Sequence, residues 1–500
     1  MNCSGAIVVL REEQIVVSTE AFVAILDALV DTDSSLHRVY ASVARFAVPD
    51  CQHQPFRICR YHHIAVLERI QFTVSGSDLA ISDTIKSLKK LGIKVYSEHS
   101  KANIKKVDTI VFSNAISRNN PELIEAKKNK IPMISRAEML SELMRFKRGI
   151  AVAGTHGKTT TTSLIASILT EAKIDPTYVI GGRLNSMLKN AKLGKSDVII
   201  VEADESDASF LHLNPINTVV TNIDKDHLEN YHGDFETLKQ TYIDFIHQAP
   251  FYENIFLCID DKILKSLIPK ILRPIVTYGI SKEAQIRAID ISHEGRKVKF
   301  KVIDNKYTKK RFTVSINFPG EHFVRNTLAA IAVALEYQVS IKDIKNALSK
   351  FDGVGRRYDV YKNICKNKKN LTVIDDYGHH PTEIEAVIKA TKKAFPRREI
   401  NLVFQPHRYT RTRDCFDELV RVLQLPNKTF LFDIYSAGES EINQISSQNI
   451  IKKIKQKKGT YLNNFADAEK AILKKINTNS IVLIMGAGNI SEFVKSFVKD

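Results

Sequence analysis

The chain has 500 residues, more than one hydrophobic core usually supports, so two to four domains are expected. Its formal net charge of +17 comes mostly from lysines at scattered polar positions. Its basic runs carry no interleaved aromatic residues, which favours a solvated surface that meets anionic substrates over a face that binds nucleic acid. The six cysteines are dispersed, which argues against a disulfide framework and a cysteine zinc site. The sequence shows neither a signal-peptide pattern nor an apolar run long enough to span a membrane, which argues against membrane insertion. Together these features favour a cytoplasmic protein.

The first domain is expected over residues 1–147, and its pattern is regular only from about residue 64. Residues 1–63 are atypical, and we assign no role to their short apolar runs. Beyond them strands alternate with helices, which predicts a parallel, doubly wound Rossmann-like sheet. Asp78 follows the first of these strands, where such folds hold a ribose or base, and a turn-forming Asp is an equally good interpretation. The expected strands are 72–75, 93–96 and 109–112, and the expected helices are 81–91 and 136–144.

A glycine-bounded turn lies between an apolar strand at 150–153 and a run with helical spacing. Gly154 and Gly157 let backbone N–H groups converge on phosphate oxygens at the positive end of the helix dipole. Lys158 adds a mobile charge, and Thr159 offers a hydroxyl to Mg²⁺. The turn therefore predicts a nucleoside triphosphate with magnesium as the ligand.

Two further strands of the central domain, expected over residues 148–352, end in polar clusters. Four carboxylates within 202–207 follow one strand, and His227 follows the next. Because Mg²⁺ takes hard oxygen ligands next to phosphates, Glu202 is the preferred metal ligand among the four, and His227 is interpreted as a metal ligand or phosphate contact. A solvated acidic turn for the other carboxylates, and a packing or surface role for His227, are the alternatives.

A third α/β pattern, expected over residues 353–500, begins near a hinge with two arginines, Arg356 and Arg357. Guanidinium groups on a glycine-flexible hinge suit phosphate clamping on domain closure, with simple surface solvation as the alternative. Charged clusters at 375–381 and 405–413 each follow a strand, as active-site loops do in open α/β sheets.

Four motifs, in this order along the chain, resemble those of the Mur ligase family. They are 153–161 (AGTHGKTTT), 202–210 (EADESDASF), 375–383 (DDYGHHPTE) and 405–412 (QPHRYTRT). The resemblance runs from about residue 64 to the C-terminus. It implies an α/β protein of three domains: a Rossmann-like N-terminal domain for a UDP-sugar, a central P-loop ATPase domain, and a Rossmann-like C-terminal domain that closes over ATP and an amino acid.

Within the family the motifs look most like the alanine-adding branch. The resemblance then implies ATP-driven ligation of L-alanine to the lactyl carboxylate of UDP-N-acetylmuramate through an acyl phosphate, with ATP and Mg²⁺ as cofactors and a monomer or weak dimer as the working form. By family position, the catalytic residues are Lys158, Glu202, His227 and Arg357, and the metal ligands are Thr159, Glu202 and His227. ATP would contact Gly154, Thr155, His156, Gly157, Lys158, Thr159, Thr160, Asn326 and Asp376. The substrates would contact Asp78, His99, His380, His407, Arg408 and Arg411.

The sequence departs from the family pattern at two places. Family members carry a glycine-rich segment about two dozen residues before Asp78, whereas residues 51–60 contain no glycine, so the backbone there cannot approach a pyrophosphate in the same way. We interpret residues 1–63 as a frame-shifted or displaced reading of the natural N-terminus, which resequencing of the coding region tests. The second departure is Phe323, where the family has an adenine-side Asn.

Three other functions stay open at this point. A murein-peptide-recycling ligase, which adds a tripeptide to the same sugar nucleotide, shares the phosphate loop and the Asp-Asp-Tyr-x-His-His-Pro stretch, although 405–412 favours the alanine-adding branch. A degenerate ligase that has lost UDP-sugar binding is the second. A nucleotide-dependent nucleic-acid-binding protein would use the charge of +17 but leaves the motifs of the third domain unexplained.

Overall fold

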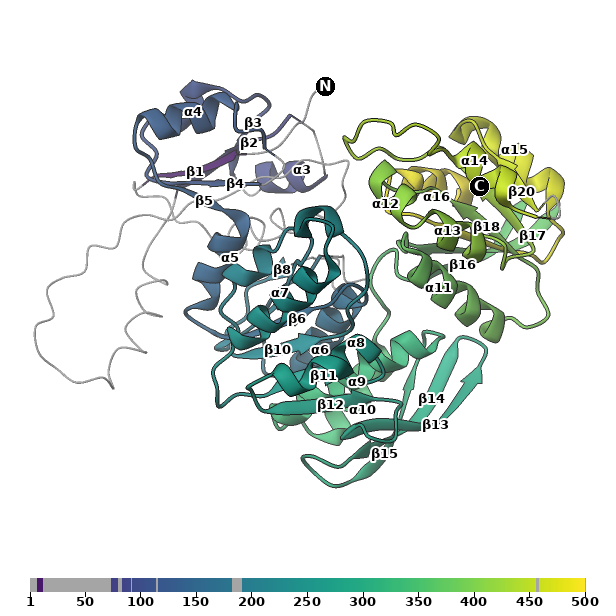
Figure 1. Cartoon of the computed structure of the whole chain (residues 1–500), viewed down its shortest axis with the longest axis horizontal. Coiled ribbons are helices and arrows are strands. Elements are labelled where there is room, and N and C mark those ends of the chain that lie inside the picture. The colour runs from purple at the N-terminus through teal and green to yellow at the C-terminus, as the bar shows by residue number, and fades with distance from the viewer. Residues whose placement is uncertain are drawn as a thin grey trace, which may run out of the picture.

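The computed structural model describes residues 7–11, 73–79, 83–90, 92–113, 116–181, 191–455 and 458–499. The fold is mixed α/β with three sheets, one in each of three domains (Figure 1), as the sequence predicted. No helix within these ranges is long and apolar enough to cross a membrane. The glycine-free stretch 51–60, and nearly all of the segment interpreted as displaced, lie outside the described residues.

The N-terminal sheet has five strands in the order β3-β2-β1-β4-β5, and it differs from the all-parallel sheet expected. The pairs β2–β3 and β4–β5 are parallel, but β1 lies between β2 and β4 and runs antiparallel to both. The inner edges of β2 and β4 present N–H and C=O groups that need partners, and an extended Ile-Val-Val-Leu segment satisfies them in either direction. The elements are β1 (Ile7–Arg11), β2 (Thr73–Ser77), α3 (Asp83–Lys90), β3 (Lys94–Tyr96), η1 (Lys101–Ile104), β4 (Ile110–Phe112), α4 (Pro121–Lys128), β5 (Met133–Ser135) and α5 (Arg136–Met144).

The central sheet has ten strands in the order β15-β14-β13-β12-β11-β10-β6-β9-β7-β8. Its middle is parallel, and β13, β14 and β15 form an antiparallel extension. These strands form the lower edge of the molecule in Figure 1. The elements are β6 (Arg148–Ala153), α6 (Lys158–Glu171), β7 (Thr177–Val179), β8 (Ala191–Lys192), β9 (Val198–Glu202), η2 (Ser209–His212), β10 (Asn217–Val220), η3 (Leu228–Tyr231), α7 (Phe235–His247), β11 (Ile255–Cys258), α8 (Lys262–Leu267), η4 (Ile268–Lys270), β12 (Ile275–Gly279), β13 (Ile286–Glu294), β14 (Lys297–Asp304), β15 (Arg311–Ile316), α9 (Glu321–Glu336) and α10 (Ile341–Lys350).

The C-terminal sheet has six strands in the order β16-β17-β21-β18-β19-β20, parallel except for β16. Strand β21 in its middle is apolar throughout because both of its faces are covered. Along β21, Ile481, Leu483 and Met485 join the large core shared with the central domain, whereas Val482 and Ile484 join a second cluster on the other face. The elements are β16 (Asp359–Lys366), β17 (Lys369–Asp376), α11 (Pro381–Ala394), β18 (Ile400–Phe404), α12 (Tyr409–Asp414), α13 (Phe416–Val422), β19 (Lys428–Leu431), α14 (Ser447–Lys453), β20 (Gly459–Tyr461), α15 (Phe465–Lys475), β21 (Ile481–Met485) and α16 (Ile490–Val498).

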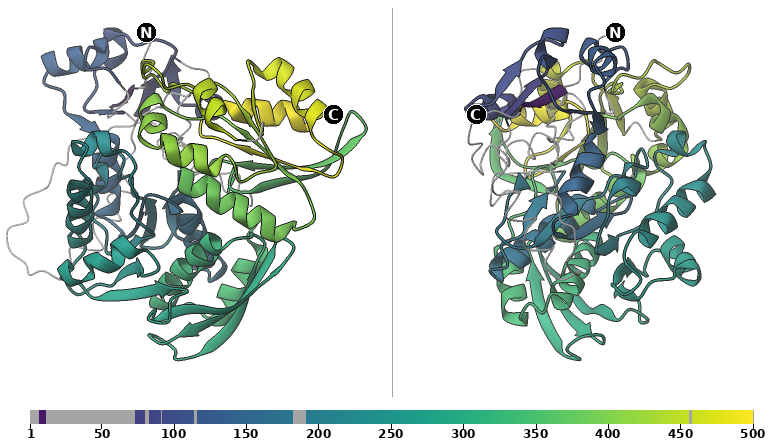
Figure 2. Two further views of the ribbon diagram at one scale, coloured as in Figure 1. Left: turned by 45° about the vertical axis from the view of Figure 1, so that its right-hand side comes forward. Right: turned by 90° about the vertical axis from the view of Figure 1, so that its left-hand side faces the viewer.

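Strand order brings the polar loops of two domains to facing edges. In the central sheet β10, β6 and β9 are adjacent and parallel, so the loops after them lie side by side. In the C-terminal sheet the loops after β17 and β18 flank β21 at its carboxyl edge. The views in Figure 2 place the C-terminal domain against the central domain on the side of α11, which contacts β13.

Candidate active site between the central and C-terminal domains

The phosphate loop joins β6 to α6, and its backbone depends on two glycines. The φ angle of Gly154 is 128° and that of Gly157 is 84°, both in the left-handed region. A Cβ on Gly154 would lie 2.1 Å from Oγ1 of Thr221, and one on Gly157 would lie 2.7 Å from Oδ1 of Asn326. Only glycine combines this conformation with so close an approach. Asn326, an expected ATP contact on α9, therefore lies directly against the loop.

Two N–H groups of the loop are bonded within the protein. Thr155 N donates to the backbone oxygen of Asn222 over 3.1 Å, and His156 N donates to its Oδ1 over 2.9 Å. The expectation that the loop N–H groups converge on phosphate is therefore wrong for these two. The first backbone hydrogen bond of α6 runs from Thr161 N to Gly157 O. The N–H groups of the residues just before Thr161 lie outside this helical ladder, and such groups at a helix N-terminus face the position where an anion binds.

Lys158 is held at the mouth of the loop by oxygen atoms. Its Nζ donates to the backbone oxygen of Gly154 over 2.7 Å and to Oε1 of Glu205 over 2.8 Å. Burial alone would lower the pKa of Lys158, but Glu205 and two further carboxylates raise it above its ordinary value, so the ammonium is charged. Glu205 is buried, which excludes for this residue the solvated acidic turn that the sequence left open.

Thr159 and Glu202 form a pair of hard oxygen ligands beside Lys158. Oγ1 of Thr159 donates to Oε1 of Glu202 over 2.8 Å. The other oxygen of Glu202, Oε2, accepts from Gly181 N over 2.7 Å, which fixes the carboxylate. Thr160, the next residue, is buried in the first turn of α6. A hydroxyl and a carboxylate in contact at the end of a phosphate loop fit the donor set that Mg²⁺ prefers.

The loop after β10 carries His227 and two aspartates, Asp224 and Asp226. Asp226 forms a buried ion pair with Arg411 of the C-terminal domain, with 2.9 Å between Oδ1 and Nε. Nε2 of His227 lies 3.3 Å from Nη2 of Arg411. Burial and Arg411 lower the pKa of His227 despite the nearby Asp226, so its imidazole is neutral. His227, an expected metal ligand, therefore lies next to Arg411, an expected substrate contact.

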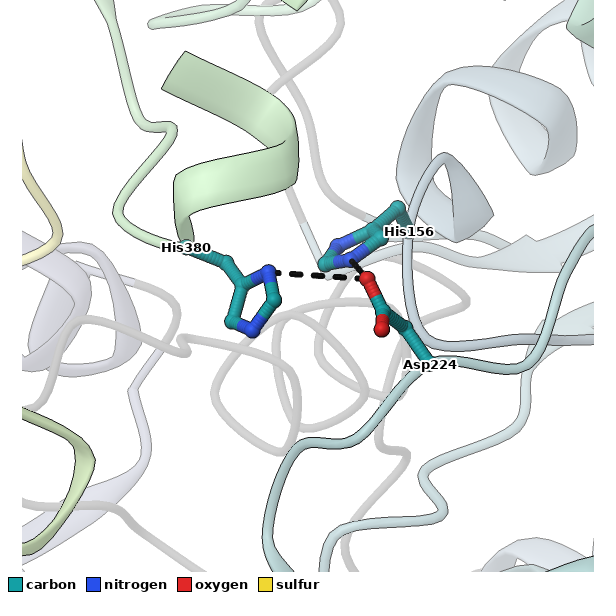
Figure 3. A group of neighbouring side chains, drawn as sticks. All are labelled: His156, Asp224 and His380. Carbon is teal, nitrogen blue, oxygen red and sulfur yellow. Dashed lines mark hydrogen bonds and ion pairs between the residues drawn. The ribbon is translucent and has the colours of Figure 1, made fainter. Parts of the chain in front are cut away.

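Asp224 joins the phosphate loop to the C-terminal domain (Figure 3). Its Oδ2 lies 3.2 Å from Nε2 of His156 and 3.6 Å from Nδ1 of His380. The two imidazole rings have centroids 5.0 Å apart. Thr382 Oγ1 donates to the same oxygen over 2.7 Å. These four side chains come from three segments of the sequence, and they form a polar bridge across the domain boundary.

Glu383 is a second carboxylate of this bridge. Its Oε1 lies 3.3 Å from Nδ1 of His156, and its Oε2 accepts from His379 N over 3.0 Å. Burial would lower the pKa of His156, but Glu383 and Asp224 raise it to about 9. The pKa of Glu383 lies well below its ordinary value despite burial, because His156 and other cations face it. The interface therefore holds an imidazolium between two carboxylates at neutral pH.

The guanidinium groups of both hinge arginines lie over the ring of Tyr377, but their polar partners differ. Arg357 lies over the ring of Tyr377, with 4.9 Å from its guanidinium carbon to the ring centroid, and its Nη1 is 3.9 Å from Glu383. Arg356 donates through Nη2 to the backbone oxygen of Gly486 over 2.5 Å. A phosphate clamp that uses both arginines is therefore not what the hinge offers, because the Arg356 side chain is held within the C-terminal domain and only Arg357 faces the bridge.

Asp376, expected near the ATP ribose, is buried at the end of β17. Its Oδ2 accepts from Tyr358 N over 2.9 Å, and its Oδ1 accepts from Gly378 N over 2.8 Å. Burial raises the pKa of Asp376 to about 7, against the lowering effects of Arg357 and of the two backbone donors. In this structure Asp376 orders the backbone that leads to the bridge.

The loop after β18 places His407 and Arg408 beside Arg411. The ring of His407 stacks on Tyr435, with centroids 5.5 Å apart, and its Nδ1 is 3.3 Å from Nη1 of Arg411. Nη1 of Arg408 lies 3.5 Å from Oε1 of Glu229 in the central domain. The three residues expected to contact the substrate from this loop are thus brought together at the same domain boundary.

His99, an expected substrate contact of the N-terminal domain, lies beside a carboxylate that the sequence did not reveal. Ser77, next to Asp78 at the end of β2, donates through Oγ to Oε2 of Glu122 over 2.7 Å. Nδ1 of His99 lies 3.0 Å from the same Oγ. Glu122 is fully buried and also accepts from Nδ2 of Asn103 over 2.6 Å. Within the described residues, Nε2 of His99 is buried without a hydrogen-bond partner.

Comparison with known proteins places this arrangement in a family. Models of the Mur ligase family match three consecutive parts of the chain: the catalytic domain over 66–148, the middle domain over 152–334 and the glutamate ligase domain over 356–488. The UDP-N-acetylmuramate–L-alanine ligase of Hydrogenovibrio crunogenus is 48% identical over 430 residues, which are 85% of this chain and 93% of that protein. The chain belongs to the Mur ligase family. Members of this family are ATP-dependent ligases, so this Mur ligase is an enzyme of that kind.

Two solved structures are similar over the same extent. The crystal structure of UDP-N-acetylmuramate-alanine ligase from Thermotoga maritima has a TM-score of 0.70 at 27% identity, over 85% of this chain and 92% of that one. A murein peptide ligase from Psychrobacter arcticus has a TM-score of 0.63 at 24% identity, which supports the fold alone. The resemblance inferred from the four motifs is thus confirmed at the level of the family and its three-domain fold.

Several residues of the site were not found by sequence reasoning. Asp224 and Asp226 lie in the segment where His227 was singled out, but no pattern told which of these side chains faces the other domain. Glu383 had a usable signal, because it stands three residues after His380, and these two form a capping box at the start of α11. Glu122 had none, since its partners come from distant segments.

Proposed function

We propose that this Mur ligase joins L-alanine to the lactyl carboxylate of UDP-N-acetylmuramate, driven by ATP, as a step of peptidoglycan precursor synthesis and hence of cell-wall formation. The observation that carries the proposal is the similarity, over nearly the whole length of the relative, to a ligase of that name. The geometry supports it, because a phosphate loop and an arginine- and histidine-rich loop of a second domain meet at one boundary, as a reaction between a nucleotide, a carboxylate and an amine requires.

The reaction has two steps. A carboxylate oxygen of the sugar nucleotide bonds to the γ-phosphorus of ATP while the bond to the ADP oxygen breaks. The alanine nitrogen then bonds to the acyl carbon, a proton leaves the nitrogen, and the tetrahedral intermediate expels phosphate. Both steps bring anions together, so catalysis needs positive charge and N–H donors around the phosphates. Lys158 and the first turn of α6 supply these in the central domain, and we assign Arg357 the same role from the C-terminal side.

Thr159 and Glu202 would hold the Mg²⁺, and we propose His227 for a second ion or for the substrate carboxylate. When bound, Mg²⁺ would supply positive charge that offsets the charge of the phosphates. The contact between Oγ1 of Thr159 and Oε1 of Glu202 supports this assignment, because both atoms are hard oxygen ligands, one in the first turn of α6 and the other at the carboxyl end of β9. The neutral imidazole of His227 is free of the charge that would repel a cation.

For the substrates we propose contacts with Asp78 and His99 in the N-terminal domain and with His380, His407, Arg408 and Arg411 in the C-terminal domain. ATP would contact Gly154 to Thr160, Asn326 and Asp376. We also propose domain limits of 1–147, 148–352 and 353–500, and the presence of three separate sheets supports them. Cys258, Cys365 and Cys415 are free, which supports a reducing compartment such as the cytoplasm, and we propose a monomer or weak dimer as the working form.

The test is phosphate release from Mg-ATP by the purified full chain, with UDP-N-acetylmuramate and with L-alanine, a tripeptide, or neither added. Release that requires both UDP-N-acetylmuramate and L-alanine is the expected result. Release with the tripeptide instead would replace the proposal by the recycling activity. ATP binding without release in any arm would identify a degenerate ligase, and it would direct attention to residues 1–63.

A further inference from the structure

We propose that His156, Asp224 and His380 form a Zn²⁺ site that ties the C-terminal domain to the phosphate loop and thereby holds the two domains together. The proposed Mg²⁺ ligands are different residues, so this is an additional metal site. The site can exist whether or not the proposed substrate specificity is correct. Only the effect of bound Zn²⁺ on turnover rests on the proposed function.

The donor set is that of a transition metal. One ligand atom from each of the three residues lies within 4.8 Å of the others. Oδ2 of Asp224 faces Nε2 of His156 and Nδ1 of His380. Two imidazoles with one carboxylate suit Zn²⁺, which binds three protein ligands and keeps a fourth position for water or substrate. Binding through Nε2 of His156 displaces to solvent the proton that this imidazolium carries at neutral pH, with its Nδ1–H kept toward Glu383. Mg²⁺ prefers oxygen ligands, so it is a poor competitor at this site.

The two spacings from Oδ2 of Asp224 to the ring nitrogens match the edges of a metal-centred tetrahedron. The distances from Oδ2 of Asp224 to the two ring nitrogens are 3.2 and 3.6 Å. A tetrahedron with ligand bonds of about 2.0 to 2.1 Å has edges of about 3.3 to 3.4 Å, between these two values. Charge-assisted N–H···O bonds are shorter, about 2.7 to 2.9 Å. Figure 3 shows both rings directed at the one carboxylate oxygen.

Each ligand also has an outer partner, as ligands of structural and catalytic zinc usually do. Nδ1 of His156 faces Oε1 of Glu383 at 3.3 Å, the carboxylate–histidine pair that orients a metal-binding ring. Nε2 of His380 faces Sγ of Cys415 at 3.6 Å. Oδ1 of Asp224 accepts from its neighbour's backbone, Lys225 N, over 2.8 Å, and its Oδ2 accepts from Thr382 Oγ1 over 2.7 Å. These contacts leave the ring nitrogens near Oδ2 for the ion. Thr382 N is 3.4 Å from Nδ1 of His380, a long contact that the metal would replace.

The ligands come from both sides of the domain boundary. His156 lies in the phosphate loop and Asp224 in the loop after β10, whereas His380 is the N-cap of α11 in the C-terminal domain. An ion bound by all three links the two domains through coordinate bonds, which are stronger than the ion pairs that now bridge them. Turnover requires the domains to part for nucleotide exchange, so bound Zn²⁺ should inhibit the enzyme.

The experiment uses the full chain with any purification tag removed and metals stripped by a chelator. Co²⁺, whose visible absorption reports four-coordinate sites, is titrated in excess Mg²⁺ into the wild type, His380→Gln and His379→Gln, and Zn²⁺ is then added as competitor. His379 is the matched control, since it adjoins His380 but supplies none of the three ligand atoms. The sequence before residue 64 also holds Cys51, His53, Cys59, His62 and His63, and the comparison between variants subtracts any ion bound there.

We expect the wild type and His379→Gln to bind one four-coordinate Co²⁺ that His380→Gln lacks or binds at least about tenfold more weakly. Equal Co²⁺ binding by wild type and His380→Gln would overturn the proposal, and so would displacement of the ion by Mg²⁺. Melting curves of the metal-free variants verify that each is folded. In a second arm, Zn²⁺ should slow phosphate release by the wild type. If no substrate combination supports release, the proposed ligase activity fails, whereas the Co²⁺ titration still decides the metal site.

Discussion

At the scale of single residues, Thr159 and Thr161 provide a matched pair of hydroxyls on one helix. Oγ1 of Thr159 contacts Glu202, whereas the buried Oγ1 of Thr161 has no hydrogen-bond partner within the described residues. Thr159→Val should reduce ATP-dependent phosphate release by about 100-fold or more, because it removes a proposed Mg²⁺ ligand without changing the side-chain shape. Thr161→Val should leave release nearly unchanged and stability equal or higher. Similar losses in both variants would show that the helix responds to any change of packing.

Gly157 tests the contact between the phosphate loop and α9. Gly157→Ala places a Cβ in the left-handed region and 2.7 Å from Oδ1 of the buried Asn326, so the loop must shift. ATP affinity, measured by calorimetry, should fall at least about tenfold, or 1.4 kcal/mol. Gly295→Ala is the control, since φ is 58° and no atom lies within 4 Å of the added Cβ. That variant should lose about 1 kcal/mol of stability from backbone strain and keep its ATP affinity.

At the scale of elements, the short helix α12 docks onto the loop after β10 through one arginine. Arg411 and Asp226 are buried partners, with side-chain exposures of 8% and 9%, whereas Arg413 on the same helix is half exposed and pairs with Asp414. Arg411→Met should cost about 3 kcal/mol or more, read as a drop in melting temperature, because Asp226 is left buried without its counter-charge. Adding Asp226→Asn should recover part of the loss. Arg413→Met should stay within about 0.5 kcal/mol, and an equal effect of both arginines would contradict the docking role.

At the scale of the whole molecule, the imidazolium of His156 makes domain docking depend on pH. Its pKa rises from 6.5 to about 9, chiefly through Glu383 and Asp224 acting against burial. A base with a raised pKa stabilises the folded state fully at pH values below its pKa in the unfolded chain, and this contribution is lost above its pKa in the folded protein. The free energy of unfolding should therefore fall between pH 6.5 and about 9, by up to about 3 kcal/mol. The raised pKa of Asp376, about 7, acts at lower pH, between the ordinary value of 3.8 and about 7.

Melting temperatures across pH 6.5 to 9.5 measure this effect. His156→Gln should flatten the fall that the wild type shows in that window. His322→Gln is the control, because burial lowers the pKa of His322 to about 4. Its ring is neutral in the folded state throughout the window, so it adds only a slope of opposite sign near pH 6.5 and none at higher pH. The same slope in the wild type and in His156→Gln would assign the pH dependence to another group.

The architecture of the whole molecule was largely predictable, whereas its interdomain chemistry was not. Uninterrupted apolar strands and amphipathic helices identified three α/β units, because these patterns are local in the sequence. The N-terminal sheet was mispredicted, since nothing local indicates that β1 runs antiparallel between β2 and β4. The partner of Lys158 was ambiguous for a related reason, because four carboxylates follow β9 and only the path of the loop buries Glu205 against the ammonium.

The sequence by itself determined the phosphate loop, since Gly154 and Gly157 permit a backbone that other residues resist, and the strand before it and helix after it are coded in adjacent residues. It also determined the family, through four motifs in a fixed order. Tertiary structure alone decided that Asp224, His156 and His380 meet around one oxygen atom. These residues are up to 224 positions apart, from 156 to 380. Strand order and the docking of one sheet edge on another bring them together. Both arise from the packing of the whole chain and leave no periodic signal in the sequence.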